Sequence, residues 1–183
     1  NGSLSWLIEQ YLGSPKYHNL SDSRKRSIRG ELDWLRGIAG DLPFAKFGVQ
    51  HVEALMGKKT GPTAANTVKK NLSMLFNFAI KREMGVTFNP ARYADRLKEN
   101  ADGYHTWTDQ EIARFKEYHP TGSKARLAMA LFLWTGAARQ DVAAMGWRNV
   151  QGDRITYRRG KTGIEADLPI HEELAAELAS VPR

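Results

Sequence analysis

The spacing of apolar positions predicts four helices in the first hundred residues. In the second of them, apolar residues from 28 to 39 follow the i, i+4, i+7, i+11 spacing that places side chains on one helix face. In the fourth, a similar stripe runs from residue 68 to 80, and Thr63 or Asn66 is available to cap it. The predicted ranges are 5–12, about 21–39, 43–56 and about 63–84.

The pattern changes after a segment of mixed charge, residues 92–106, which we interpret as a linker. Thr108 and Glu111 fit a capping box for a helix that reaches about residue 118. The run 127–134 is apolar on every side, which predicts a helix buried in a core. Alternating residues in 154–159 and 164–170 predict a strand pair. Short helices are expected at 139–145 and from residue 172 to 178.

This pattern predicts a mainly α protein with two domains. Residues 1–98 are expected to form a helical domain. Residues 103–183 are expected to form a mixed α/β unit with a small antiparallel sheet.

Composition excludes several classes of protein. The 183 residues include no cysteine, which rules out disulfides, thiolate metal sites and cysteine nucleophiles. No run of 18 apolar residues occurs, and no basic segment followed by an apolar block opens the chain, so the sequence predicts neither a membrane span nor a secretory signal. Metalloprotease and nucleotide-binding motifs are not found either, and we expect no metal and no cofactor.

The net charge of +7 is concentrated in the first hundred residues. These carry 16 Lys and Arg against 9 Asp and Glu, whereas residues 101–183 carry 11 of each kind. A positive surplus confined to one domain is typical of proteins that bind the phosphate backbone of nucleic acids. The plainer interpretation, that the charge only keeps a small domain in solution, stays open.

Two of the predicted helices carry basic and polar side chains away from their apolar stripes. A helix packed on its own domain by one face can lay the other in a DNA major groove, where cations pair with phosphates and Ser or Asn reaches base edges. The alternative is that these side chains only face solvent. We expect contacts with double-stranded DNA from Arg24, Lys25, Arg29, Lys69, Lys70, Ser73 and Asn77.

Three short motifs then stand in a fixed order: W-T-D-Q-E at 107–111, T-G-A-A-R-Q-D at 135–141 and K-T-G at 161–163. Together they resemble the tyrosine recombinases of the phage-integrase family, whose motifs there read roughly T-G-x-R-x-x-[DE] and K-T-G. Residues 66–90 resemble the last helix of that family's core-binding domain. The resemblance covers most of the chain and implies a four-helix, SAM-like core-binding domain followed by the N-terminal portion of a truncated catalytic domain.

The resemblance assigns catalytic roles to two residues. Lys161, in the turn between the predicted strands, matches the lysine that protonates the leaving 5′ oxygen when DNA is cut. The slot of the first catalytic arginine holds Ala138, and Arg139 stands one place later, which turns a helical side chain by about 100°. Arg139 therefore takes the role only after a local shift in register. Otherwise it pairs with Asp141 or Glu165, and the domain is catalytically degenerate.

Two further motifs of the family are not found in this chain, namely the H-x-x-R pair and the nucleophilic tyrosine. None of the five histidines has an arginine three positions later, and the last tyrosine, Tyr157, precedes Lys161. We therefore expect that the chain alone does not cut and rejoin DNA, whether it is a fragment or a naturally shortened product.

For a full-length protein, the resemblance implies site-specific recombination of a mobile element by a tetramer on DNA, through a 3′-phosphotyrosine intermediate. It also implies a bacterial or phage-encoded protein in the cytoplasm, associated with the nucleoid. Two other interpretations stay open for this chain. One is a DNA-binding regulator derived from an integrase, and the other is a helical protein-interaction domain without a nucleic-acid role.

Overall fold

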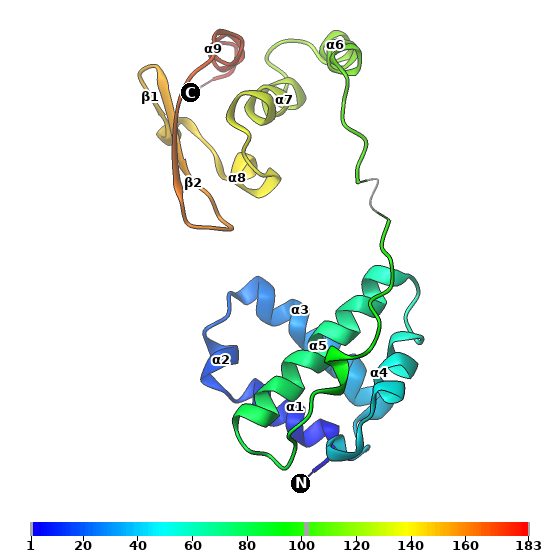
Figure 1. Ribbon diagram of the computed structural model, residues 1–183. Helices are drawn as coiled ribbons and strands as arrows, with labels where there is room; N and C mark the ends of the chain where they lie inside the picture. The colour runs from blue at the N-terminus through cyan, green and yellow to red at the C-terminus, as the bar shows by residue number, and fades with distance from the viewer. Residues whose placement is uncertain (1, 101–102, 183) are drawn as a thin grey trace. The chain divides into compact units, whose positions relative to one another are not determined.

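The computed structural model describes residues 2–100 and 103–182. Contacts divide the chain into two compact units, Asn1–Gly103 (unit 1) and Tyr104–Arg183 (unit 2), and each has its own hydrophobic core. Unit 1 is helical, and unit 2 combines helices with a small antiparallel sheet (Figure 1). The prediction of a mainly α fold with a small antiparallel sheet is confirmed.

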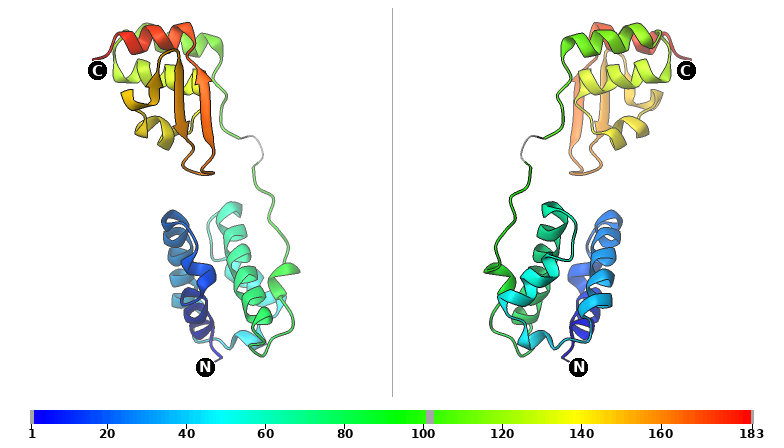
Figure 2. Two further views of the ribbon diagram at one scale, coloured as in Figure 1. Left: turned by 90° about the vertical axis from the view of Figure 1, so that its left-hand side faces the viewer. Right: turned by 90° about the vertical axis from the view of Figure 1, so that its right-hand side faces the viewer.

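Unit 1 is built from four longer helices and one short helix. The views in Figure 2 place α1 and α3 along one side of the unit and α4 and α5 along the other. The apolar stripe predicted for the last helix is buried between them, with Val68, Leu72 and Leu75 fully covered. The helices are α1 (Leu4–Leu12), α2 (Pro15–His18), α3 (Asp22–Ala39), α4 (Val49–Met56) and α5 (Pro62–Lys81).

The predicted third helix, residues 43–56, is wrong in its first half. A 3-10 turn, η1 (Phe44–Lys46), is followed by Phe47 in an extended conformation, and α4 begins only after Gly48. The backbone N–H of Gly48 donates to Nδ1 of His51 at 2.9 Å, which fixes the start of α4. Phe44 and Phe47 are nevertheless buried, as their apolar character predicts.

Two prolines start helices where other boundaries were expected. Pro15, interpreted as a terminator of the first helix, is the first residue of α2, because proline fits the first turn, where no N–H partner is needed. Pro62 likewise opens α5, preceded by Gly61 with a positive φ of 89°. Neither Thr63 nor Asn66 therefore caps α5.

The segment after α5 packs against unit 1 further than the linker prediction allowed. A 3-10 turn, η2 (Pro90–Arg92), buries Ala91, and Ala94 is also in the core. The side chain of Asn66 then bonds both backbone polar groups of Leu97. Residues 92–99, predicted as part of the linker, thus belong to unit 1.

Unit 2 contains a three-stranded sheet of order β1-β2-β3, and some of its helices share a hydrophobic core with that sheet. The predicted strand pair is confirmed: β2 and β3 are antiparallel, with Ile155 opposite Leu168 and Tyr157 opposite Ala166. The capping box of Thr108 and Glu111 is confirmed too. The elements are α6 (Asp109–Tyr118), α7 (Lys124–Thr135), α8 (Arg139–Ala144), η3 (Trp147–Asn149), β1 (Val150–Gln151), β2 (Arg154–Arg158), β3 (Glu165–Pro169) and α9 (Glu172–Ala179).

The prediction that α7 is buried on every side is wrong. Ala130 and Leu131 are buried, but Phe132 and Leu133 are 38% and 41% exposed. The face of α7 that is turned from the sheet forms an apolar groove of about 470 Å³ with α6, which no part of the described chain fills. No helix among the described residues is both long enough and apolar enough to cross a membrane.

Candidate functional site

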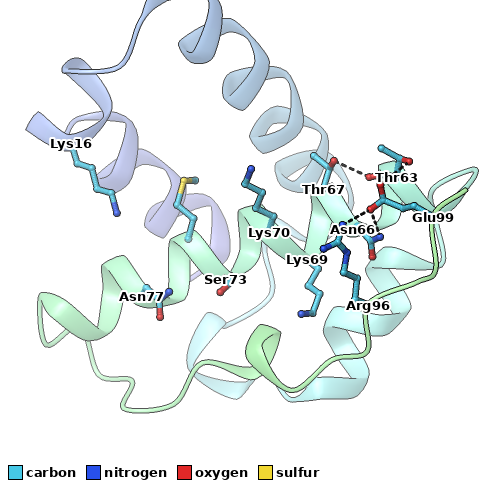
Figure 3. A pocket seen from close by; sticks show the side chains of 11 residues that line it. Lys16, Thr63, Asn66, Thr67, Lys69, Lys70, Ser73, Asn77, Arg96 and Glu99 are labelled. Carbon is cyan, nitrogen blue, oxygen red and sulfur yellow. Dashed lines mark hydrogen bonds and ion pairs between the residues drawn. The ribbon is translucent and has the colours of Figure 1, made fainter. Parts of the chain in front are cut away.

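A polar groove of about 700 Å³ runs along α5 in unit 1 (Figure 3). Residues of α5 at spacings of three and four line it, because such residues share one helix face. Lys16 of α2 and Lys70 of α5 both border the groove, and Arg96 comes from the segment after η2. We call it the α5 groove, and its lining comprises Lys16, Thr63, Asn66, Thr67, Lys69, Lys70, Ser73, Met74, Asn77, Arg96 and Glu99.

The α5 groove gathers all four residues that the sequence singled out on the fourth helix, namely Lys69, Lys70, Ser73 and Asn77. It also holds two cations that sequence reasoning missed. Lys16 was missed because Pro15 was interpreted as ending the first helix, and Arg96 was missed because it lies in the predicted linker. Only the fold brings these two segments beside α5.

The basic residues predicted on the second helix do not line this groove. Lys25 lies 3.8 Å from Asp22, and Arg29 lies 3.9 Å from Asp33, so each has a carboxylate on its own helix. Arg24 is exposed at the start of α3. The structure therefore separates Arg24, Lys25 and Arg29 from the cluster on α5.

The lysines of the α5 groove keep their charge uncompensated. Within the described residues, Lys16, Lys69 and Lys70 form no ion pair. Lys59, outside the groove, shows the contrast, since it lies 3.1 Å from Glu31 and 3.7 Å from the centre of the Trp34 ring. A set of unpaired ammonium groups around one concave surface attracts an anionic ligand.

Glu99 is the acidic member of the α5 groove. Its carboxylate accepts from Nδ2 of Asn66 at 2.6 Å, from Nη2 of Arg96 at 3.0 Å and from the hydroxyl of Thr63 at 3.4 Å. These hydrogen bonds, that of Asn66 first, hold the pKa of Glu99 below its ordinary value. The negative charge of Glu99 offsets that of Arg96 at one end of the groove.

A buried asparagine supports the other end of the groove. Asn89 is 4% exposed, and its Nδ2 donates to Oδ1 of Asn77 at 2.8 Å and to Oγ of Ser73 at 3.1 Å. The same amide nitrogen lies 3.1 Å from the backbone carbonyl oxygen of Ser73. Oδ1 of Asn89 accepts from the N–H of Ala91 at 3.1 Å. Because its nitrogen faces acceptors and its oxygen faces a donor, the Asn89 amide is fixed in one orientation.

In unit 2, the Thr135-Gly136 pair forms a rigid corner after α7. Gly136 ends the helix with a left-handed φ of 59°, which glycine adopts without strain. The Thr135 hydroxyl donates to the carbonyl of Leu131 at 2.6 Å and accepts from the N–H of Ala137 at 3.2 Å. The Tyr157 hydroxyl donates to the Thr135 carbonyl at 3.1 Å, which ties this corner to β2.

Asp141 connects the start of α8 to the turn between β2 and β3. Its Oδ1 accepts from the N–H of Gly160 at 2.9 Å, and the carboxylate is largely buried. Arg139, in the first turn of α8, is exposed, and in the described part of the chain it pairs with neither Asp141 nor Glu165. The expectation of such a pair is wrong, because Asp141 is directed to the turn instead. Lys161 is exposed beside Gly160.

Two backbone hydrogen bonds close the turn that carries Lys161. The N–H of Arg159 donates to the carbonyl of Ile164, and the N–H of Gly163 donates to the carbonyl of Arg159, both at 2.8 Å. Among residues 2–100 and 103–182, His, Asp and Glu side chains do not gather in any group of three that could hold a metal ion.

Solved structures with the same fold cover nearly the whole chain. A lambda integrase tetramer bound to a Holliday junction superimposes with a TM-score of 0.82 at 18% identity, over 98% of this chain and 55% of that one. A lambda integrase dimer bound to a COC′ core site gives a TM-score of 0.78 at 20% identity, over 97% and 67%. The Tn1549 transposon integrase with circular intermediate DNA gives 0.76 at 14% identity, over 98% and 64%.

These likenesses confirm the predicted fold, and the chain spans 55% of the length of the lambda integrase in the tetramer. No protein-family model matches the sequence, and no curated protein matches it either.

Proposed function

We propose that this chain binds double-stranded DNA, mostly through the α5 groove. The observation that carries the proposal is the set of three unpaired lysines, Lys16, Lys69 and Lys70, around a groove that also presents the polar side chains of Ser73 and Asn77. Duplex DNA is the ligand that this combination fits best, because it offers regularly spaced phosphates and base edges to one helix.

The two kinds of side chain have different tasks in this proposal. The lysines neutralise phosphates, release counterions and set the position of α5 on the duplex. Ser73 and Asn77 then reach base edges in the major groove, which admits a helix. Arg24, Lys25 and Arg29 add to the general attraction from a separate surface of unit 1.

The comparisons support this proposal through the ligands of the similar proteins. The lambda integrase structures contain a Holliday junction or a core site, and the Tn1549 integrase structure contains circular intermediate DNA. Their fold extends over both units of this chain. We therefore propose that residues 1–98 act as a core-binding domain and residues 103–183 as the N-terminal portion of a catalytic domain.

We further propose that a longer protein containing this chain is a tyrosine recombinase that works as a tetramer on DNA. Lys161, on its short closed turn, would protonate the leaving 5′ oxygen, and Arg139 would bind a phosphate oxygen of the same site. The Asp141–Gly160 hydrogen bond supports this pairing of roles, since it ties the helix of Arg139 to the turn of Lys161.

A second candidate function is a DNA-binding regulator that does not cleave DNA. The position of Ala138 favours it, since this small side chain stands just before α8 in the slot where the recombinase motif has its arginine. A nicked suicide substrate separates the two candidates. The recombinase is supported if the longer protein forms a covalent protein–DNA adduct and Lys161→Ala slows its formation at least tenfold. DNA binding without any adduct supports the regulator.

The DNA proposal itself is tested by a salt titration with a short duplex. The affinity of the full chain should fall steeply with salt, because each phosphate contact contributes about 0.9 to the slope of log K against log salt. The double variant Lys69→Gln/Lys70→Gln should lower that slope by roughly 2. Lys81→Gln is the matched control, since Lys81 is exposed on α5 but does not line the groove.

Two results would overturn the proposal. One is the failure of the unaltered chain to bind any duplex at low salt, which would favour a helical protein-interaction domain. The other is equal binding by the double variant and the unaltered chain.

A further inference from the structure

Asn89 donates to the side-chain oxygens of Ser73 and Asn77, and it leaves the hydrogen-bond donors of both side chains free. Nδ2 of Asn89 points at Oδ1 of Asn77 and at Oγ of Ser73. If the Asn77 amide were turned over, two NH₂ groups would face each other, so its orientation is determined by Asn89. The Nδ2 group of Asn77 is therefore the part of the amide that faces away from Asn89.

Neither donor is used inside the protein. Within the described residues, no acceptor lies within hydrogen-bond distance of Nδ2 of Asn77, and the Ser73 hydroxyl hydrogen has no acceptor either. Asn77 is exposed, Ser73 is half-buried, and both line the α5 groove. The two residues are one helical turn apart, about 6 Å along the axis, which is within two base-pair steps of about 3.4 Å each.

We infer that Asn89 is a positioning residue that presents Ser73 and Asn77 as a pair of donors, and that this pair selects guanine over adenine in the bound DNA. The inference rests on the proposed function. A free asparagine reads adenine with both amide atoms, accepting from N6 and donating to N7. Here Oδ1 of Asn77 is held at the buried Nδ2 of Asn89, whereas Nδ2 of Asn77 and the Ser73 hydroxyl hydrogen have no partner among the described residues. The pair therefore best matches an edge that offers only acceptors. N7 and O6 of guanine form such an edge in the major groove.

Asn89 itself does not touch DNA in this account. It is 4% exposed and acts through the two residues on α5. Its own acceptor is bound to the N–H of Ala91, which holds it in place independently of Ser73 and Asn77. A change of Asn89 that removes only the donor should thus alter base selection without removing the lysines that bind phosphates.

The test is a selection of bound sequences from a pool of random duplexes by the full chain and three variants. For the unaltered chain we expect guanine at one or two contacted positions. Asn77→Ala should lose that preference while other selected positions persist. Asn77→Asp, which still accepts from Asn89 but no longer donates, should shift the preference toward a base with an amino group. Asn89→Asp retains the acceptor for Ala91 and should also lose the guanine preference.

A second measurement does not depend on the buried variant. Replacement of the selected guanine by 7-deazaguanine should weaken binding of the unaltered chain by about 5- to 100-fold, the range of a good base contact. It should leave binding by Asn77→Ala nearly unchanged. Lys81→Gln is the control, and it should behave as the unaltered chain in both measurements.

The outcomes separate this inference from the proposed function. If the chain binds no duplex, the proposed function fails. If it binds DNA but selects adenine at the position that Asn77 controls, shows no base preference, or retains the same preference in Asn77→Ala, the donor-pair inference is wrong while the proposed function stands.

Discussion

At the scale of single residues, Glu99 is the exception in the α5 groove. Its negative charge is opposite to that of the lysines and would repel an anionic ligand. Its carboxylate accepts hydrogen bonds from Asn66, Arg96 and Thr63, so these three donors of the groove lining have a partner within the protein. Asn66 also holds Leu97, which shows that this corner secures the chain after η2. The sequence could not predict this, because residues 66 and 99 come together only in the folded unit.

The first prediction concerns that acid. Glu99→Gln removes a negative charge from the groove that the lysines line but retains an oxygen that accepts from Asn66. The affinity for duplex DNA should rise about two- to fivefold, as expected for one exposed charge pair. A fluorescence anisotropy titration checks this, with Glu83→Gln as the control, since Glu83 is an exposed acid outside the groove. Unchanged or weaker binding would show that Glu99 does not oppose DNA.

The second prediction concerns Glu111 in the capping box of α6. Its carboxylate accepts from the N–H of Thr108 at 2.7 Å and contacts Nε2 of His105 at 2.8 Å. The Thr108 backbone bond, followed by the His105 contact, lowers the pKa of Glu111 from 4.5 to about 2. A lowered carboxyl pKa stabilises the folded state above about pH 4.5, and this contribution is lost as the pH falls toward 2.

A carboxyl-carbon NMR titration measures this pKa directly. The Glu111 signal should titrate near 2, and Glu111→Gln should remove this residue's part of the pH dependence of stability between those values. A midpoint near 4.5 would contradict the capping-box account of Glu111.

At the scale of helices and strands, the sequence predicts an element well when its apolar residues are confined to one face. The stripe on α5 determines which face is buried, so the groove face with Lys69, Lys70, Ser73 and Asn77 could be predicted. The apolar run in α7 has no polar face, so the sequence does not show which face of this helix is buried. The exposure of Phe132 and Leu133 was therefore not predicted. The side-chain caps predicted for α5 were also wrong, because the helix begins at Pro62 after Gly61.

The third prediction concerns the connection between α8 and the β2–β3 turn. Asp141→Ala removes the acceptor of the Gly160 N–H, and the loss of one hydrogen bond of about 1 kcal/mol should speed local opening roughly fivefold. Asp141→Asn is the matched variant, since its amide oxygen can still accept. Hydrogen exchange of the Gly160 amide reports the difference, and equal rates in both variants would show that Asp141 does not hold the turn.

At the scale of the whole molecule, the charge asymmetry along the sequence indicated the unit that carries the candidate site. The composition of the site was harder to predict. Lys16 and Arg96 stand 80 positions apart in the sequence, and no local pattern links them to each other or to α5. The motifs of unit 2 were recognised from their order, whereas the Asp141–Gly160 bond that connects two of them depends on the fold.

The fourth prediction separates site-specific binding from general charge. Arg114→Gln/Lys124→Gln removes two exposed cations from unit 2, and Lys69→Gln/Lys70→Gln removes the same charge from the α5 groove. If the groove binds DNA, only the second pair should reduce affinity by tenfold or more at moderate salt. Fluorescence anisotropy under the same conditions measures the affinity of both double variants. Equal losses of affinity in the two would mean that net charge alone drives binding.

DNA binding by the α5 groove is tested most directly by an NMR titration of the full chain with a short duplex, followed through backbone and side-chain amide signals. We expect the largest shifts at Lys69, Lys70, Ser73 and Asn77 of α5 and near Lys16, with the side-chain NH₂ of Asn77 among them. Shifts that avoid the α5 groove, or that appear only along α4 or in unit 2, would contradict it.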